Sequence, residues 1–290
     1  MEEGKEGGRR MKKIAWITDS TCYAEKDWLE AHRIHVVPLS VIFGEESFKE
    51  GEQITTAEFY ERMKRTKTLP KTSQPSIGDF ISLYERLAAE YEQGIAVHLS
   101  SGISGTYQTS VQAAEMVGFP LKAIDSRIAT YPVTYMLQEG LRLEEEGLEA
   151  DAIVQRLEEL KERFESYFLV DDLSHLHRGG RLNAAQFVVG SVLQIKPILT
   201  IRGGRITPVE KIRTFKKAKE RIYEHFAADA KEGVPMRACV IHANAEEEAS
   251  RWVEELKSLY PHVEYHISVF GPVIGTHVGA GTLGLTWYKV

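Results

Sequence analysis

Two segments rich in hydroxyl side chains stand out for the chemistry they could perform. Residues 70–76 read Pro-Lys-Thr-Ser-Gln-Pro-Ser and residues 99–107 read Leu-Ser-Ser-Gly-Ile-Ser-Gly-Thr-Tyr, and each precedes a stretch with the apolar spacing of an amphipathic helix. A helix start offers unpaired N–H groups and the positive end of the helix dipole, so nearby hydroxyls complete a site for an anion. The second segment contains no Lys or Arg, which favours a carboxylate or a single phosphate over a polyanion.

Within these segments, Thr72 and Ser104 are the candidate ligand-binding residues. For either residue alone, capping of the following helix is the commoner role of such a hydroxyl. Two such segments in one chain, together with a glycine-rich segment near the C-terminus, favour binding. We therefore expect Thr72 and Ser104 to act together on one anionic group.

The segment 178–181 places two arginines around two glycines. Glycine lets a backbone approach a ligand closely, and arginine pairs with a carboxylate or phosphate through two hydrogen bonds. The same four letters recur at 202–205, where the flanking alternation predicts a hairpin turn, so the motif alone is weak evidence. Only the first copy, 178–181, lies between a predicted strand and a predicted apolar helix. We expect this helix at 184–194, with Asn183 as its N-cap.

His277 lies in the glycine-dense segment 271–284. A histidine exposed among glycines could bind an anion or transfer a proton near neutral pH, and the alternative is a loop histidine bonded to the backbone. Other potential ligands precede the first arginine pair, but their spacing matches no established zinc pattern, so we expect no metal. These residues are Asp171, Asp172, His175 and His177.

Strands and helices that alternate through the first half must position these residues. Short apolar runs lie at 13–17, 36–43, 95–99 and 121–124, with helical stretches between most of them. This alternation predicts an α/β fold with a mainly parallel sheet covered on both faces. Ligands bind such sheets beyond the carboxyl ends of the strands, so the segments that follow there should form one shared site. They are residues 18–21, 100–106 and 125–127.

The second half has a different pattern, typical of a mixed sheet. A long acidic helical stretch at about 128–166 leads to a strand at 168–170 and a hairpin at 198–213 around Gly203 and Gly204. Two helix–strand units follow, and residues 285–290 could form a closing strand. We expect a flexible extension at 1–12, an N-terminal α/β lobe at 13–160 and a C-terminal α/β lobe at 161–290.

The composition narrows the class of function. The 290 residues are 43% hydrophobic and 27% charged with a net charge of −6, typical of a soluble globular protein and unfavourable for nucleic-acid binding. No apolar run approaches the roughly 18 residues of a membrane span, and no signal-peptide core is evident, so a cytoplasmic protein is expected. Two cysteines form no metal or redox spacing.

Neither common nucleotide-binding motif occurs, which favours a binder of a small anionic ligand without its own ATP site. The alternative is a stand-alone hydrolase or transferase that acts on a small carboxylated or phosphorylated metabolite. In that enzyme His277 would be the general acid or base, and Ser104 the nucleophile or anchor. The five-residue Gly-x-Ser-x-Gly spacing of a nucleophile elbow is missing around Ser104.

Several motifs, taken in order, resemble the DegV family of bacterial fatty-acid-binding proteins. The resemblance runs from Lys13 to the C-terminus, and it rests on residues 17–20, 72–75, 100–107, 125–127, 178–181 and 271–277. One departure is Ala280, which stands where the family often has proline.

The resemblance implies a two-lobed α/β protein that buries a long-chain fatty acid between its lobes. Thr72 and Ser104 would hold the carboxylate, and Arg181 and His277 would lie near the head group. It implies no cofactor, no catalytic residue of its own and no stable membrane insertion. The partner would be a separate ATP-dependent fatty-acid kinase subunit, which converts the bound acid to an acyl phosphate for phospholipid synthesis.

Overall fold

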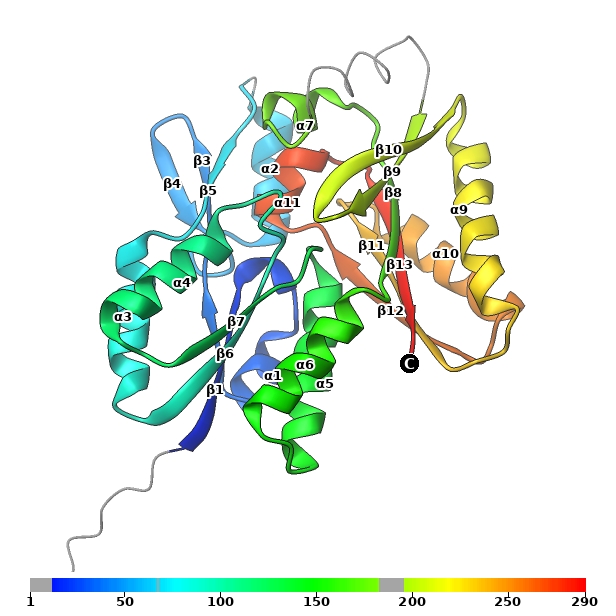
Figure 1. Cartoon of the computed structure of the whole chain (residues 1–290). Coiled ribbons are helices and arrows are strands. Elements are labelled where there is room, and N and C mark those ends of the chain that lie inside the picture. Colours follow the sequence, from blue (N-terminus) through cyan, green and yellow to red (C-terminus); the bar gives the residue numbers. More distant parts are fainter. Residues whose placement is uncertain (1–11, 67, 183–195) are drawn as a thin grey trace, which may run out of the picture.

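The apolar strands of the first half form a parallel sheet, as their alternation with helices predicts. In the computed structural model, which describes residues 12–66, 68–182 and 196–290, the strand order is β2-β1-β6-β7 and every neighbouring pair is parallel (Figure 1). The strands are β1 (Lys12–Asp19), β2 (Ile34–Val37), β6 (Tyr91–His98) and β7 (Leu121–Asp125).

Both faces of this sheet are buried because successive side chains of a strand point to opposite faces. On β1, Ala15 and Ile17 pack in the same cluster as residues of α3 and α4, whereas Trp16 packs with residues of α5 and α1. The prediction of a parallel sheet covered on two sides is confirmed. The helices are α1 (Lys26–Ala31), α3 (Ile77–Ala88), α4 (Thr106–Val117) and α5 (Tyr131–Glu145).

The apolar run 36–43, predicted as one strand, is divided between two sheets. Pro38 separates the two halves, because proline lacks the N–H that a strand ladder needs. The second half joins a small antiparallel sheet that the sequence did not predict, in the order β4-β3-β5. Its strands are β3 (Ser40–Phe43), β4 (Glu46–Lys49) and β5 (Lys71–Ser73), and α2 (Thr56–Arg65) connects the last two.

Thr72 does not lie at a helix start, contrary to expectation. It is the middle residue of β5, opposite Val41 of β3. Helix α3 is capped instead by Ser76, whose hydroxyl accepts from the Asp79 N–H at 3.1 Å while the Asp79 carboxylate accepts from the Ser76 N–H. The Thr72 hydroxyl is therefore not used in capping.

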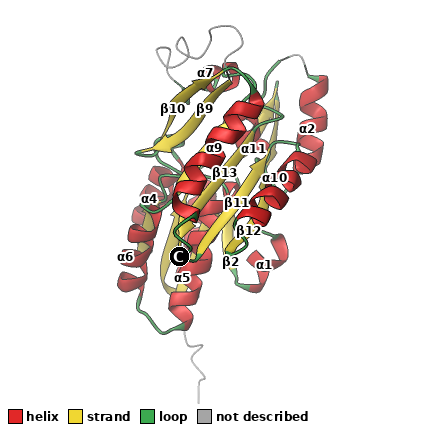
Figure 2. Ribbon diagram, turned by 90° about the vertical axis from the view of Figure 1, so that its right-hand side faces the viewer, coloured by secondary structure: helices red, strands yellow, loops and turns green. Residues whose placement is uncertain are grey.

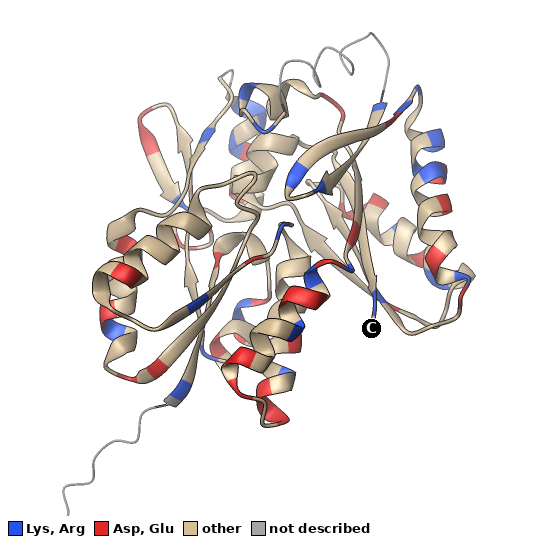
Figure 3. Cartoon of the chain, in the orientation of Figure 1, with Lys and Arg blue, Asp and Glu red and all other residues tan. Residues whose placement is uncertain are grey.

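The acidic stretch predicted as helical at 128–166 consists of two helices and the start of a strand. Helix α5 ends at Glu145 and α6 (Ala150–Lys161) begins after a turn in which Gly147 has a φ of +87°. Glycine adopts this left-handed conformation without steric cost, which explains the break. In Figure 3, acidic residues, coloured red, cluster at and around this turn.

Six described strands of the second half form a mixed sheet in the order β10-β9-β8-β13-β11-β12, in which only β11 and β12 are parallel. The predicted hairpin around Gly203 and Gly204 and the predicted closing strand are both confirmed. The strands are β8 (Glu165–Leu169), β9 (Lys196–Arg202), β10 (Arg205–Ile212), β11 (Met236–His242), β12 (Val263–Val269) and β13 (Leu283–Lys289).

Helices α9 (Phe215–Ala230) and α10 (Glu246–Leu259) cover the outer face of this sheet (Figure 2). The inner face shares one hydrophobic cluster with α5 and the parallel sheet, and the Tyr135 hydroxyl of α5 donates to the carbonyl of Ala238 in β11 at 3.1 Å. The predicted boundary between the two lobes, near residue 160, falls just before β8 and stays a prediction. Three short helices complete the described chain: η1 (Ser20–Cys22), α7 (Ser174–Arg178) and α11 (Pro272–Val278).

Some sequence predictions fall on other parts of the chain. The extension before residue 12, and the apolar helix at 184–194 with its cap Asn183, lie outside the described residues. No described helix is long and apolar enough to cross a bilayer.

The carboxyl ends of β1 and β6 are joined by a buried chain of polar side chains that continues to α4. The Asp19 carboxylate accepts from the Leu99 N–H at 2.9 Å and pairs with His98 at 3.1 Å, and His98 continues to Ser110 at 2.8 Å. The residue types are those of a hydrolase triad, but Asp19, His98 and Ser110 are all fully buried. This chain therefore holds the strand ends together and is closed to substrate.

Replacing Asp19 tests this role, because Asp19→Ala leaves buried donors without an acceptor. We expect the free energy of unfolding to fall by about 3 kcal/mol, measured by urea denaturation. The control is Asp27→Ala in α1, where the side chain is exposed. Equal stability of the two variants would show that the buried chain does not support the sheet.

Candidate functional site

The four residues singled out in the sequence line one cavity, although they come from four separate parts of the chain. Thr72 lies in β5, Ser104 in the loop before α4, Arg181 in the loop after α7 and His277 in α11. The space between the lining side chains, including the part open to solvent, measures about 780 Å³.

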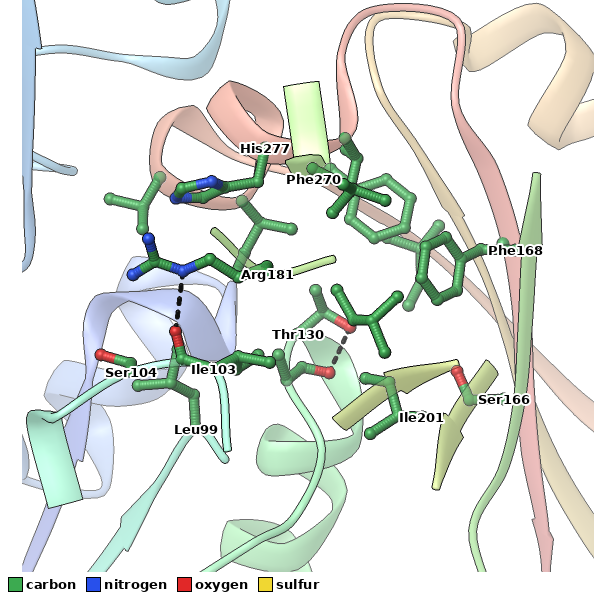
Figure 4. Close-up of a pocket in the computed structure, with 18 of the residues that line it drawn as sticks. Leu99, Ile103, Ser104, Thr130, Ser166, Phe168, Arg181, Ile201, Phe270 and His277 are labelled. Atoms are coloured by element: carbon green, nitrogen blue, oxygen red, sulfur yellow. Dashed lines mark hydrogen bonds between the residues drawn. The ribbon is translucent and has the colours of Figure 1, made fainter. Parts of the chain in front are cut away.

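The cavity has one polar end, and the rest of its lining is mainly apolar, with Thr130 and Ser166 as polar exceptions. In Figure 4, Ser104, Arg181 and His277 lie on one side of the space and the aromatic rings of Phe168 and Phe270 on the other. Most of the other lining residues are aliphatic, and they come from the mixed sheet, the loops after β2, β6 and β7, and the helices α7 and α11. They include Leu39, Leu99, Ile103, Leu176, Ile201, Ile206, Ile241, Val273, Ile274, Val278 and Leu285.

His277 is buried in a helix and is not the exposed loop histidine that its glycine-rich surroundings predicted. It is only 8% exposed, and its Nε2 lies 2.8 Å from the Thr72 hydroxyl. Its Nδ1 has no hydrogen-bond partner among the described residues. The His277 ring can occupy this position only because residue 179 is glycine, since a Cβ there would lie 2.3 Å from Nδ1 of the ring.

The charge state of His277 follows from its surroundings. Burial first, and then the charges of Arg181 and His175, lower the pKa of His277 to about 3. The imidazole is therefore neutral near pH 7. A neutral ring can form one hydrogen bond with the Thr72 hydroxyl through Nε2, while its Nδ1 packs against Gly179.

Arg181 is half-buried at the polar end and bonds only to backbone oxygens in the described structure. Its Nε donates to the Ile103 carbonyl at 2.9 Å, and its Nη1 donates to the Gly179 carbonyl. No carboxylate of the described residues forms an ion pair with it. Burial lowers the pKa of Arg181, but a guanidinium remains charged, so an anion in the cavity would balance this cation.

Ser104 lies just before α4, as predicted, although the N-cap residue itself is Gly105. The Ser104 hydroxyl lies 2.9 Å from that of Thr106 and accepts weakly from the Thr106 N–H at 3.3 Å. Gly105 packs against Gln74, where a Cβ would lie 2.2 Å from the side-chain oxygen. This contact brings the Ser104 loop close to the segment that follows Thr72.

The hydrolase interpretation gains no support from these contacts. Within the described parts of the chain, Ser104 bonds to Thr106 and not to a histidine, whereas His277 bonds to Thr72. A nucleophilic serine needs a base within hydrogen-bond reach. The described residues also contain no cluster of three metal-ligating side chains.

The predicted shared site at the strand ends is only partly correct. Of the segments 18–21, 100–106 and 125–127, only the second lines the cavity. Asp125 instead accepts from the Ser101 N–H at 3.0 Å, and Asp19 accepts from the N–H of Leu99. The acidic residues at these ends therefore hold the loops in place.

A second hollow meets the cavity at its polar end. Thr72, Arg181 and His277 line both spaces. The second hollow is more polar, and its other residues include three basic side chains: Lys71, His175 and Arg178. The strand and helix that carry them, β5 and α7, lie near the top of the molecule in Figure 1. The polar end of the cavity thus faces a basic mouth.

The sequence analysis missed the contribution of the β9–β10 hairpin. The sequence predicted the turn of this hairpin but no role for it in the site. The turn contacts the loop that carries Ser104, where the Ser100 hydroxyl donates to the Gly204 carbonyl at 2.7 Å. A Cβ on Gly102 would lie 2.3 Å from the same carbonyl oxygen, so both segments need glycine here. The alternating apolar pattern on the strands was the available signal, since Ile201 and Ile206 face the cavity.

The low pKa of His277 gives a direct test. We expect its ring C–H resonances not to shift between pH 5 and 8 in an NMR titration, because the neutral form persists down to about pH 3. The unfolded chain takes up this proton below its ordinary pKa near 6.5, so His277 makes the fold less stable as the pH falls from 6.5 towards 3. A titration midpoint near 6.5 would show that the ring is solvated.

Comparison with known proteins agrees with this architecture. The family model described as "Uncharacterised protein, DegV family" matches residues 13–290. The DegV domain-containing protein BH3627 of Halalkalibacterium halodurans is 49% identical over 280 residues, which cover 96% of this chain and 99% of that protein.

Two solved structures share the whole fold. One, described as DegV, a fatty acid binding protein from Bacillus subtilis, has a TM-score of 0.91 and 47% identity, covering 96% of this chain and 100% of that one. A DegV family protein from Thermus thermophilus, described by its fatty acid binding, has a TM-score of 0.89 and 32% identity with the same coverage. The chain belongs to the DegV family.

Proposed function

We propose that this protein binds a long-chain fatty acid, with the tail in the apolar cavity and the carboxylate at Thr72, Ser104, Arg181 and His277. The observation that carries this proposal is the division of one cavity into a polar end and a mainly apolar remainder. That division matches an amphiphile with a single charged head. The described fatty-acid binding of two similar structures supports the same class of ligand.

The tail should supply most of the affinity. A sixteen-carbon acid has roughly fifteen apolar carbons, and burial of each contributes about 0.8 kcal/mol, which gives a gross ~12 kcal/mol. Ordering the chain and losing its free motion offset much of this gain. Each charge-assisted hydrogen bond to the head contributes about 1.5–3 kcal/mol, so the polar residues mainly fix the orientation of the acid.

The head-group residues then have complementary roles. Arg181 provides a positive charge that no described carboxylate balances, while the hydroxyls of Thr72 and Ser104 can each donate one hydrogen bond. Neutral His277 adds no second charge and instead orients the Thr72 hydroxyl through their 2.8 Å contact. The carboxylate would thus be held at the boundary between the cavity and the basic mouth.

We further propose that a separate ATP-dependent kinase subunit phosphorylates the bound acid, and that the acyl phosphate supports phospholipid synthesis in the cytoplasm. A carboxylate oxygen would bond to the γ-phosphorus as the bond to ADP breaks. The basic mouth supports this step, since Lys71 and Arg178 can offset the negative charge of an arriving phosphoryl group. Neither of the two common nucleotide-binding motifs occurs in the sequence, which supports an ATP site on the partner.

The head-group assignment is tested with the double variant Thr72→Ala and Ser104→Ala. We expect fatty-acid affinity to fall at least about tenfold, because the carboxylate loses two hydrogen-bond donors. The measurement is mass spectrometry of the lipid retained after purification. Ser73→Ala combined with Thr207→Ala is the matched control on exposed positions, and equal retention by both double variants would contradict the assignment.

Phosphoryl transfer is tested at the basic mouth. Arg178→Gln removes a positive charge that does not line the apolar cavity, so lipid retention should persist while acyl phosphate formation with the kinase subunit falls about tenfold. Arg202→Gln is the control, since it changes the matching arginine of the second Arg-Gly-Gly-Arg copy. Equal turnover in the two variants would argue against a role for the mouth.

A further inference from the structure

The N-terminal end of helix α11 is hydrogen-bonded to a buried carboxyl group that lies 223 positions earlier in the sequence. Glu50, which follows β4, accepts through Oε1 from the Val273 N–H at 2.8 Å and from the Tyr23 hydroxyl at 3.0 Å. Its Oε2 accepts from the Ser20 hydroxyl at 2.6 Å. The residue is only 4% exposed, and no lysine or arginine of the described chain forms an ion pair with it.

Two tyrosines complete this attachment. The Tyr23 hydroxyl also accepts from the Ile274 N–H at 3.4 Å, and the Tyr60 hydroxyl donates to the Phe270 carbonyl at 2.6 Å. Both rings press directly on the helix backbone: a Cβ on Gly271 would lie 2.3 Å from the Tyr23 ring, and one on Gly275 would lie 2.5 Å from the Tyr60 hydroxyl. We call Glu50, Tyr23 and Tyr60 the α11 clamp.

The same helix forms a wall of the cavity. Val273, Ile274, His277 and Val278 all line it, and His277 positions the Thr72 hydroxyl. Because α11 has only seven residues, a shift at its N-terminal end displaces its whole length. The α11 clamp therefore fixes the positions of the apolar side chains of α11 and of His277, although none of its three residues lines the cavity.

We propose that Glu50 is a positioning residue of the ligand site, which fixes α11 and whose protonation state controls how firmly the bound acid is retained. This inference rests on the proposed fatty-acid binding. The carboxylic acid form suits the site, since Oε1 still accepts two hydrogen bonds while the protonated Oε2 can donate to the Ser20 oxygen. The carboxylate form leaves a buried negative charge without a cation.

The direction of the pH effect follows from burial. Burial raises the pKa of Glu50 to about 7, partly opposed by the hydrogen bonds from Ser20, Val273 and Tyr23. If α11 detaches, Glu50 becomes solvated and its pKa returns towards its ordinary value. Detachment is then easier as the pH rises towards 7. The other groups that face Glu50 or line the adjoining hollow are Asp19, Cys22, Tyr60, Lys26, Glu30 and Glu52.

The test measures dissociation of a fluorescent long-chain fatty acid from the full chain between pH 5.5 and 8. For the wild type we expect the dissociation rate to rise about tenfold over this range. Glu50→Gln keeps both Oε1 bonds and cannot ionise, so its rate should stay near the low-pH value throughout. Glu50→Leu leaves three buried donors unpaired and should dissociate about tenfold faster at every pH.

Glu52→Gln is the matched control, because this exposed neighbour lines the same hollow and should follow the wild type. Hydrogen exchange of residues 273–278 in ligand-free protein provides a second readout, with faster exchange expected in Glu50→Leu. If that variant does not fold, Tyr23→Phe replaces it with a smaller acceleration expected.

The two levels of inference fail differently. A wild type that does not bind the fatty acid at any pH would overturn the proposed function. A wild type that binds, with Glu50→Gln showing the same pH dependence and the same exchange in α11, would overturn the role of Glu50 alone.

Discussion

The hydrogen bond between Thr72 and His277 joins two segments that are 205 positions apart in the sequence, and the polar end of the cavity depends on it. It connects the small antiparallel sheet to α11, and so fixes the distance between two walls of the cavity. The other ring nitrogen of His277, Nδ1, has no hydrogen-bond partner among the described residues and packs against Gly179, where a Cβ would lie 2.3 Å from it. The positive charge at this end of the cavity is that of Arg181.

Close approach of backbone to side chain makes this arrangement feasible. Gly179 admits the His277 ring, Gly105 admits Gln74, and Gly102 meets the carbonyl of Gly204 on the hairpin. Each contact joins segments from separate elements. These glycines thus allow separate elements to pack closely around the cavity.

The apolar part of the cavity arises where the two large sheets share a core. Side chains from the parallel sheet and the inner face of the mixed sheet belong to one cluster, and α5 lies between them. Protein interiors are closely packed, so a space lined by residues of this shared core is a candidate ligand site. The buried chain from Asp19 to Ser110 holds the nearby strand ends and leaves the Ser104 loop available for the ligand.

Periodicity and local motifs determined the parallel sheet and the hairpin at Gly203 and Gly204, and motifs shared with the DegV family indicated the four residues that line the polar end. These features depend on spacing along the chain, which a sequence displays directly. Only the tertiary structure decided that Thr72 lies in a strand, that His277 is a buried neutral residue of a helix, and that Glu50 anchors that helix. Burial and long-range hydrogen bonds set these properties, and they depend on which distant residues meet.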